Sequence, residues 1–245
     1  MTQGRPSAFQ RKTFAVVVAG GKGVRMHSGV RKQYLNLAGR PILVRTLEQF
    51  VSSPDVHKTV LVIPEQDRKF CRDHLLKPWH LTGSIRMVAG GKERQSSVRN
   101  GLEAVENDHC RGEKKIVLVH DAVRPFAGHE MIRRCIDGAE AYGACVPAIP
   151  VVDTLKKADA GSFVARTRSR EHLFQVQTPQ AFELSLILRA HALAEQTGFA
   201  GTDDASLVEQ MGEKVFIVEG SRKNIKITTS EDLELAELFC SNFWS

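Results

Sequence analysis

Apolar runs alternate with amphipathic segments along the first 150 residues. The runs are rich in β-branched side chains, as is typical of buried parallel strands, and cover residues 14–18, 59–63, 85–88, 116–119 and 144–149. Between them, apolar positions recur at helical spacing in four segments: one beginning at Pro41, and residues 66–76, 96–105 and 130–141. This alternation predicts βαβ units with right-handed crossovers. The fold class is therefore α/β, with a mostly parallel sheet flanked by helices.

The pattern changes at residues 150–177, which are polar and have no helix beside them. Asp159-Ala160-Gly161-Ser162 is a turn signal between two extended segments, which indicates a β-hairpin. The hairpin could be an arm that reaches a second subunit or a surface feature of its own subunit. Because an isolated hairpin is only marginally stable, the arm is the favoured interpretation. Helix 184–195, strand 215–218 and a last helix capped by Ser230 follow.

We expect one domain over residues 1–245. Residues 1–12 are polar and basic, lack the apolar segment of a signal peptide, and are expected to form a flexible tail. No apolar stretch reaches the length that spans a membrane, so no membrane association is expected. The net charge of +6 could indicate nucleic acid, but much of the excess lies in glycine loops. Small phosphorylated ligands explain it equally well, and we expect no nucleic-acid partner.

The five cysteines form no CxxC pair, and their odd number argues against a disulfide framework. Buried thiols in a reducing compartment are the expected state, which favours a cytoplasmic location.

A basic glycine loop follows the first apolar run. It reads Ala19-Gly20-Gly21-Lys22-Gly23-Val24-Arg25-Met26, with Lys32-Gln33-Tyr34 beyond it. Glycines at a strand end let backbone N–H groups approach a ligand, and the three cations Lys22, Arg25 and Lys32 predict a polyanion, most simply a nucleoside triphosphate. The loop lacks the third glycine of a dinucleotide fingerprint and the GK[ST] of a Walker A loop. A tight turn with incidental surface bases is the plainer alternative.

Three further segments carry polar groups near predicted strand ends. Gly90-Gly91-Lys92-Glu93-Arg94-Gln95-Ser96-Ser97 predicts contacts to a base and ribose, although Ser96 or Ser97 could simply cap a helix. Asp121, after a buried strand, suits a Mg²⁺ ion shared with substrate phosphates; the alternative is a helix N-cap. We expect a structural or positioning role for His120. Lys226 lies in a short apolar strand, where it faces an anion or protects a sheet edge.

Taken together, these segments resemble the 2-C-methyl-D-erythritol 4-phosphate cytidylyltransferases of the non-mevalonate isoprenoid pathway. The resemblance extends from about residue 14 to the last helix. Besides the segments above, it rests on Arg124-Pro125, Asp153-Thr154-Leu155-Lys156, Thr178-Pro179-Gln180, Thr202-Asp203-Asp204-Ala205-Ser206 and Asn224-Ile225-Lys226-Ile227-Thr228. It implies a Rossmann-like nucleotidyltransferase fold and a homodimer held by the β-arm at residues 150–177.

The resemblance also implies the roles of individual residues. Arg25, Lys32 and Lys226 would be catalytic, and Asp121 would bind Mg²⁺ or another divalent cation. The phosphorylated polyol would contact Asp121, Arg124, Thr154, Lys226 and, from the partner's arm, Arg170; Arg166 and Arg168 are close alternatives to Arg170. The co-substrate CTP would lie along Ala19, Gly20, Gly21, Gly23, Arg25, Lys32, Gly91, Ser97 and Ala122.

The implied reaction transfers CMP from CTP to the acceptor phosphate and releases pyrophosphate. Ribitol 5-phosphate is an alternative acceptor, and a noncatalytic nucleotide sensor is an alternative class. One position departs from the family: Arg31 stands where a proline usually precedes the Lys-Gln pair. Since proline fixes φ, its loss is expected to leave the loop more mobile, and Arg31 is expected to add a cation near the triphosphate.

Overall fold

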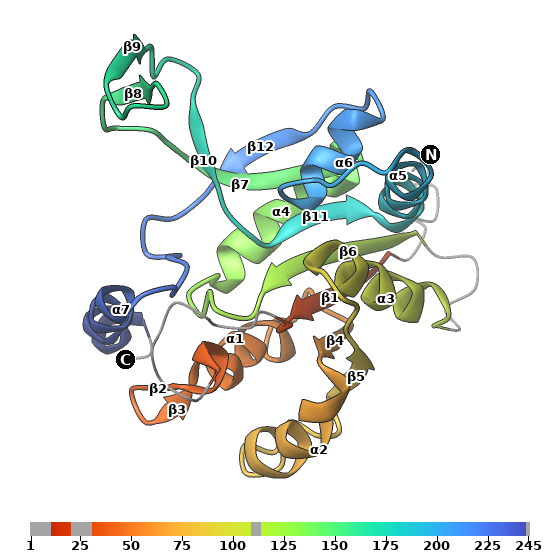
Figure 1. Cartoon of the computed structure of the whole chain (residues 1–245). Coiled ribbons are helices and arrows are strands. Elements are labelled where there is room, and N and C mark those ends of the chain that lie inside the picture. The colour runs from red at the N-terminus through yellow and green to blue at the C-terminus, as the bar shows by residue number, and fades with distance from the viewer. Residues whose placement is uncertain (1–10, 21–30, 109–113, 244–245) are drawn as a thin grey trace, which may run out of the picture.

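A single twisted sheet forms the centre of the protein (Figure 1). The computed structural model describes residues 11–20, 31–108 and 114–243. The main sheet contains β1 (Lys12–Val18), β4 (Lys58–Ile63), β5 (Ile85–Ala89), β6 (Lys115–Asp121), β7 (Ala144–Pro150), β10 (Phe174–Val176), β11 (Gln180–Glu183) and β12 (Phe216–Glu219). Short pairs are β2 (Asn36–Leu37) with β3 (Arg40–Pro41), and β8 (Leu155–Ala158) with β9 (Val164–Arg168).

The strand order confirms the predicted α/β class. Strands β6, β1, β4 and β5 are neighbours in that order and all parallel, and β12 runs parallel to β7. Strand β11 lies between β6 and β7 and is antiparallel to both, so the sheet is mixed. The five predicted apolar runs all lie in strands, where their backbone groups pair; four of them are buried over nearly their whole length, whereas residues 85–88 form the edge strand β5, in which Arg86 is exposed.

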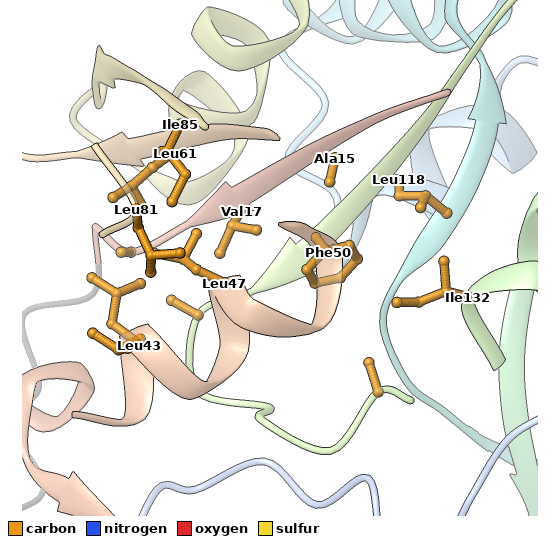
Figure 2. Close-up of a cluster of buried hydrophobic side chains, with 14 of the residues drawn as sticks. Ala15, Val17, Leu43, Leu47, Phe50, Leu61, Leu81, Ile85, Leu118 and Ile132 are labelled. Carbon is orange, nitrogen blue, oxygen red and sulfur yellow. The ribbon is translucent and has the colours of Figure 1, made fainter. Parts of the chain in front are cut away.

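Helices cover both faces of the sheet. They are α1 (Ile42–Val51), α2 (Arg68–Phe70), α3 (Arg94–Glu106), α4 (His129–Tyr142), α5 (Leu184–Thr197), α6 (Asp204–Gln210) and α7 (Ser230–Phe243), with short turns η1 (Lys32–Tyr34), η2 (Glu65–Asp67) and η3 (Cys71–Leu76). One core cluster packs α1, η3 and α4 against the sheet, and a second packs α3, α5 and α6 against its other face. In Figure 2, Leu47 and Phe50 of α1 lie beside Val17 of β1.

Several predicted boundaries needed correction. Residues 66–76 are not one α-helix but a 3-10 turn, one α-turn and a π-helical turn. Pro41 is the N-cap of α1 rather than its first residue. At α7 the cap is Thr229, whose hydroxyl accepts from the Asp232 N–H at 3.3 Å while the Asp232 carboxylate accepts from the Thr229 N–H at 2.9 Å. Helix α6, the β2–β3 pair and strand β11 were not predicted.

The predicted hairpin is present and protrudes from the body of the protein, as Figure 1 shows at β8 and β9. Its tip leaves Phe163 75% exposed and Val164 62% exposed. Residues 174–176, which the prediction placed in the arm, instead pair with β7 in the main sheet. The protruding part therefore stops short of residue 174.

Helix α3 lies directly against the sheet at Gly101, and this close approach can be tested by mutation. A Cβ at Gly101 would lie 2.4 Å from Val16 Cγ1 and 2.9 Å from Val62 Cγ2, both on buried strands. Gly101→Ala is therefore expected to lower the free energy of unfolding by about 1–3 kcal/mol, despite alanine's better helix propensity. Urea denaturation measures the change. Gly83→Ala, where a Cβ meets no atom within 4 Å, is the control; equal stability of both variants would contradict the close approach.

Candidate active site

A pocket of about 310 Å³ opens beyond the carboxyl ends of β1 and β6 and the turn after β5. It lies where ligands bind in open α/β sheets. Eight of the predicted site residues line it: Ala19, Gly20, Lys32, Gly91, Ser97, Asp121, Ala122 and Lys226. Segments far apart in the sequence thus meet at one site.

The turn that carries Lys32 is tied to the end of β1. Buried Gln33 donates from Nε2 to the Ala19 carbonyl oxygen at 2.8 Å, and the Ala19 N–H donates to the Val62 carbonyl oxygen at 2.8 Å. These bonds hold Lys32 at the pocket wall beside Ala19 and Gly20. The other predicted residues of this loop, Gly21, Gly23 and Arg25, lie outside the described residues.

The structure shows the backbone conformation of Arg31 and the residue that its side chain contacts. Its φ of −63° is the value that a proline would impose, and its Nε lies 2.9 Å from Asp67 Oδ2. The Tyr34 hydroxyl donates to the same carboxylate oxygen at 2.8 Å. Arg31 does not line the pocket. The addition of a cation near the triphosphate stays a prediction, since in the structure the Arg31 guanidinium pairs with Asp67 and anchors the start of the Lys32 turn.

The second glycine turn is held by serine hydroxyls. The Gly91 N–H donates to Ser97 Oγ at 3.0 Å, and Ser97 Oγ donates to the Glu93 carbonyl oxygen at 2.8 Å. Glu93 is the N-cap of α3 and forms a reciprocal capping box with Ser96. A Cβ at Gly91 would lie 2.2 Å from Ser96 Oγ, so this close turn requires glycine. Ser96 thus supports the helix start, whereas Ser97 fixes the turn at the pocket wall.

Asp121 is the last residue of β6 and receives two cations. Lys226 Nζ lies 2.7 Å from Asp121 Oδ2, and Arg94 Nε lies 3.4 Å from Asp121 Oδ1. Burial would raise the pKa of Asp121, but Arg94, Lys226 and Arg124 together outweigh it and hold the pKa well below its usual range. Asp121 is not a helix N-cap, since the next helix, α4, begins at His129 after Gly128. The carboxylate is therefore ionised and faces the pocket.

His120 is buried behind Asp121 rather than in the pocket. Nδ1 lies 2.9 Å from Thr178 Oγ1, and Nε2 lies 2.9 Å from the Arg124 carbonyl oxygen. The Asp121 N–H donates to the same Thr178 hydroxyl at 3.2 Å. One consistent assignment has the hydroxyl donating to Nδ1 and Nε2–H donating to the carbonyl. This arrangement supports the expected positioning role.

Burial lowers the pKa of His120 to about 4, and this gives a pH prediction. Between about pH 4 and 6.5 the unfolded chain binds a proton that the folded protein excludes. The free energy of unfolding is therefore expected to fall as pH is lowered through this range, by up to about 3 kcal/mol from this residue. Urea denaturation at several pH values should show a weaker pH dependence in His120→Gln. The exposed His74→Gln is the control, and an unchanged slope in His120→Gln would contradict the assignment.

On the other side of Asp121, Arg124 and Lys226 belong to neighbouring segments. Arg124 donates from a terminal nitrogen to the Asn224 carbonyl oxygen at 2.7 Å, and buried Asn224 donates from Nδ2 to the Thr178 carbonyl oxygen at 2.8 Å. Lys226 does not lie in a strand, so protection of a sheet edge does not explain it. Arg124 lies beside the lining residue Val123 but does not itself line the pocket.

The predicted residues of the arm do not reach this pocket within one chain. Thr154 and Arg170 are exposed, and Arg170 donates to the Val152 carbonyl oxygen. Their assignment to substrate binding therefore stays a prediction. In the other direction, the pocket includes residues that were not assigned individually: Val18, Gln33, Lys92, Glu93, Arg94 and Val123, of which Lys92, Glu93 and Arg94 belong to the segment predicted to contact a base and ribose. Arg94 carried a usable signal, since it lies shortly after the second glycine pair, separated from it by Lys92 and Glu93.

The donor set fits a magnesium ion held mainly by substrate phosphates. Within residues 11–20, 31–108 and 114–243, no group of three or more His, Cys, Asp or Glu side chains is placed to hold a metal ion by itself. Mg²⁺ typically uses one or two carboxylates together with phosphates and water. Asp121, ionised at the pocket wall, can supply one such carboxylate.

Four of the five cysteines, Cys71, Cys135, Cys145 and Cys240, are free and buried, as expected; Cys110 lies outside the described residues.

In the part of the chain that the structure describes, no helix is both long and apolar enough to cross a bilayer.

Comparisons with known proteins identify the family. The family model described as 2-C-methyl-D-erythritol 4-phosphate cytidylyltransferase matches residues 13–242. Curated proteins of that name are 45% identical over 229 residues in Syntrophus aciditrophicus, covering 93% of this chain and 95% of the relative, and 46% identical over 224 residues in Geobacillus kaustophilus, covering 91% and 94%.

Solved structures agree in fold. The 4-diphosphocytidyl-2C-methyl-D-erythritol synthase of Anaerococcus prevotii superposes with a TM-score of 0.79 at 32% identity, over 94% of this chain and 96% of that one. The 2-C-methyl-D-erythritol 4-phosphate cytidylyltransferase of Thermus thermophilus gives a TM-score of 0.75 at 33% identity, over 93% and 98%. The predicted Rossmann-like fold and nucleotidyltransferase class are thereby confirmed, and the chain belongs to the 2-C-methyl-D-erythritol 4-phosphate cytidylyltransferase family.

Proposed function

We propose that this protein transfers CMP from CTP to 2-C-methyl-D-erythritol 4-phosphate, forming 4-diphosphocytidyl-2-C-methyl-D-erythritol and pyrophosphate. Membership of the family supports the reaction. The observation that carries it is the convergence of Lys32, Lys226 and Asp121 with two glycine turns on one pocket. Lys32 beside the glycine turn after β1 and Lys226 beside Asp121 supply cations for two phosphorylated substrates, and the Asp121 carboxylate can hold a divalent cation.

We assign the triphosphate to the side of the pocket formed by Ala19, Gly20 and Lys32. Fixed cations there stabilise the charge that develops on the nonbridging and leaving oxygens of the α-phosphate. We assign the base and ribose to the neighbouring turn that holds Gly91 and Ser97; the Ser97 hydroxyl lies next to Gly20. Arg25, from the loop outside the described residues, is assigned to the same charge stabilisation on the strength of the resemblance.

We assign the acceptor phosphate to Lys226 and Arg124. Lys226 Nζ is paired with Asp121 in the structure, and its side chain is 43% exposed, so it can also meet an incoming phosphate. The acceptor oxygen attacks the α-phosphorus in line, with no covalent enzyme intermediate. No proton needs to be removed from an ionised phosphate, so positioning and charge supply the acceleration. Thr154 and a partner's arm with Arg170 complete the acceptor site in this proposal.

Asp121 is the proposed ligand of Mg²⁺ or another divalent cation. When bound, the ion neutralises charge on the triphosphate and helps the pyrophosphate to leave. Lys226 and Arg94 keep the carboxylate ionised before substrates arrive.

A homodimer held by the β8–β9 arm is part of the proposal, as is a cytoplasmic location. The arm exposes Phe163 and Val164, apolar side chains that a second subunit could cover. The buried free thiols suit a reducing compartment.

The test measures pyrophosphate release with CTP and each acceptor. The proposal expects turnover with 2-C-methyl-D-erythritol 4-phosphate and much slower turnover with ribitol 5-phosphate. Preference for ribitol 5-phosphate, which the comparisons do not favour, would overturn the acceptor assignment. CTP binding with no pyrophosphate release would instead indicate a sensor. Salt-sensitive nucleic-acid binding that CTP does not compete away would indicate a different function.

A further inference from the structure

Three segments that contain none of the individually assigned substrate-binding residues meet beside Asp121. They are Glu93-Arg94 at the start of α3, Thr178-Pro179-Gln180 before and in β11, and Thr202–Ser206 at the start of α6. Arg94 connects this group to the pocket. One terminal nitrogen of its guanidinium lies 2.7 Å from Asp204 Oδ2, and its Nε lies 3.4 Å from Asp121 Oδ1. Arg94 and Asp204 are 110 positions apart in the sequence.

Asp204 is held in place independently of Arg94. Its residue is 1% exposed. Gln180 Oε1 accepts from the N–H groups of Asp204 and Ala205 at 3.1 and 3.0 Å, and Gln180 Nε2 donates to Asp203 Oδ2 at 2.7 Å. Gln180 thus fixes the first turn of α6 against β11. A carboxylate buried in this way needs a cationic partner, and Arg94 supplies it.

The ion pair with Asp204 limits how Arg94 pairs with Asp121. A planar guanidinium pairs best with a carboxylate through two parallel hydrogen bonds. Here the short contact goes to Asp204, and Asp121 receives only the longer one through Nε. Without the Asp204 charge, Arg94 would be able to pair fully with Asp121 and would leave an uncompensated positive charge beside it. Both effects oppose a divalent cation at Asp121.

We propose that Asp204 is a positioning residue that restrains and neutralises Arg94, so that Asp121 stays available to a divalent cation and the acceptor side of the pocket. The proposal rests on the proposed metal role of Asp121. Asp204 itself does not line the pocket, so it acts through Arg94 and not on the substrates.

The test uses Mn²⁺ as the probe, because free Mn²⁺ can be counted by its electron paramagnetic resonance signal. Binding is measured on the full chain with CTP and without acceptor, so no turnover is needed. Asp204→Asn is expected to bind Mn²⁺ about 10-fold more weakly than the wild type, the lower end of what loss of a partner behind a metal ligand costs. Asp137→Asn makes the same chemical change at an exposed carboxylate of α4 outside the pocket, and is expected to stay within about twofold.

A double variant separates positioning from a general loss of structure. In Asp204→Asn combined with Arg94→Met, the competing guanidinium is gone, and removal of both partners of a buried pair is often tolerated. This variant is expected to bind Mn²⁺ at least as tightly as the wild type. Affinity below the wild type in the double variant would overturn the proposal, and this criterion still applies if Asp204→Asn alone does not fold.

Comparison with Asp121→Asn distinguishes two failures. Weaker Mn²⁺ binding in Asp121→Asn but wild-type affinity in Asp204→Asn would overturn this inference alone. Equal affinity in the wild type and Asp121→Asn would overturn the metal role of Asp121 and this inference together, while pyrophosphate release by the wild type would still support the proposed reaction.

Discussion

Replacing Lys32 by alanine is expected to lower kcat by about 10²- to 10³-fold, the usual cost of removing one fixed charge-stabilising group from an active site. The side chain lines the pocket from a turn that Gln33 ties to the end of β1. Its ammonium is proposed to meet charge that grows as the bond to pyrophosphate breaks, so kcat should fall more than the affinity for CTP. Steady-state kinetics with CTP and the methylerythritol phosphate measure both.

The control is Lys69→Ala, which removes an exposed lysine of α2 outside the pocket. Its kcat is expected to match the wild type. Circular dichroism and the melting temperature show whether Lys32→Ala keeps the fold. Near-normal turnover in a folded Lys32→Ala protein would contradict the role assigned to this residue.

Replacing Asp121 by asparagine is expected to lower kcat/KM at saturating Mg²⁺ by at least about 10²-fold, because the amide lacks the charge that a hard cation prefers. The change also leaves Lys226 without its partner at 2.7 Å, so the acceptor side loses its arrangement as well. Removing divalent cations from the wild type with a chelator should reproduce most of the loss. Asp121→Asn should then show little further response to the chelator.

The pH dependence provides a second check on Asp121. Its pKa is held far below the ordinary carboxyl range, so it stays charged at every pH above that range. A folded-state pKa below the unfolded value gives stability that is present at neutral pH and is lost only as pH falls through the folded value. No loss of kcat/KM from protonation of Asp121 is therefore expected between about pH 5 and 9. An acidic limb in this range that Asp121→Asn abolishes would contradict the assignment.

Much of this architecture could be predicted because its causes are local. An unbroken β-branched run buries both faces of a strand, and the spacing of Leu43, Leu47 and Phe50 places them on one face of α1, where they meet Val17 (Figure 2). The glycine turns were also visible, since the second one needs a residue without a Cβ at Gly91. The irregular segment at 65–76 escaped prediction, because its apolar positions match a helix while its hydrogen bonds change from one turn to the next.

The contacts of Arg31 could not be predicted from the residues around it in the sequence. The sequence shows a missing proline and an added charge, and a more mobile loop is a reasonable expectation from those facts. The packing of η2 beside η1 places Asp67 where it pairs with Arg31 and Tyr34 together. A contact between two turns more than thirty positions apart in the chain has no signature in the residues on either side of them.

By itself, the sequence determined the five apolar strands of the first 150 residues, the hairpin, most helices, and the basic and acidic residues that follow the strands. These depend on the period of apolar side chains and on what each residue type can do at a strand end. Only the tertiary structure decided which charges pair: Lys226 and Arg94 with Asp121, and Arg94 with buried Asp204. Such pairs depend on how whole helices and strands pack, and burial then strengthens each charge interaction far beyond its value in water. The residues that form the polyanion pocket can therefore be identified from the sequence, whereas the ion pairs at Asp121 are determined only by the folded structure.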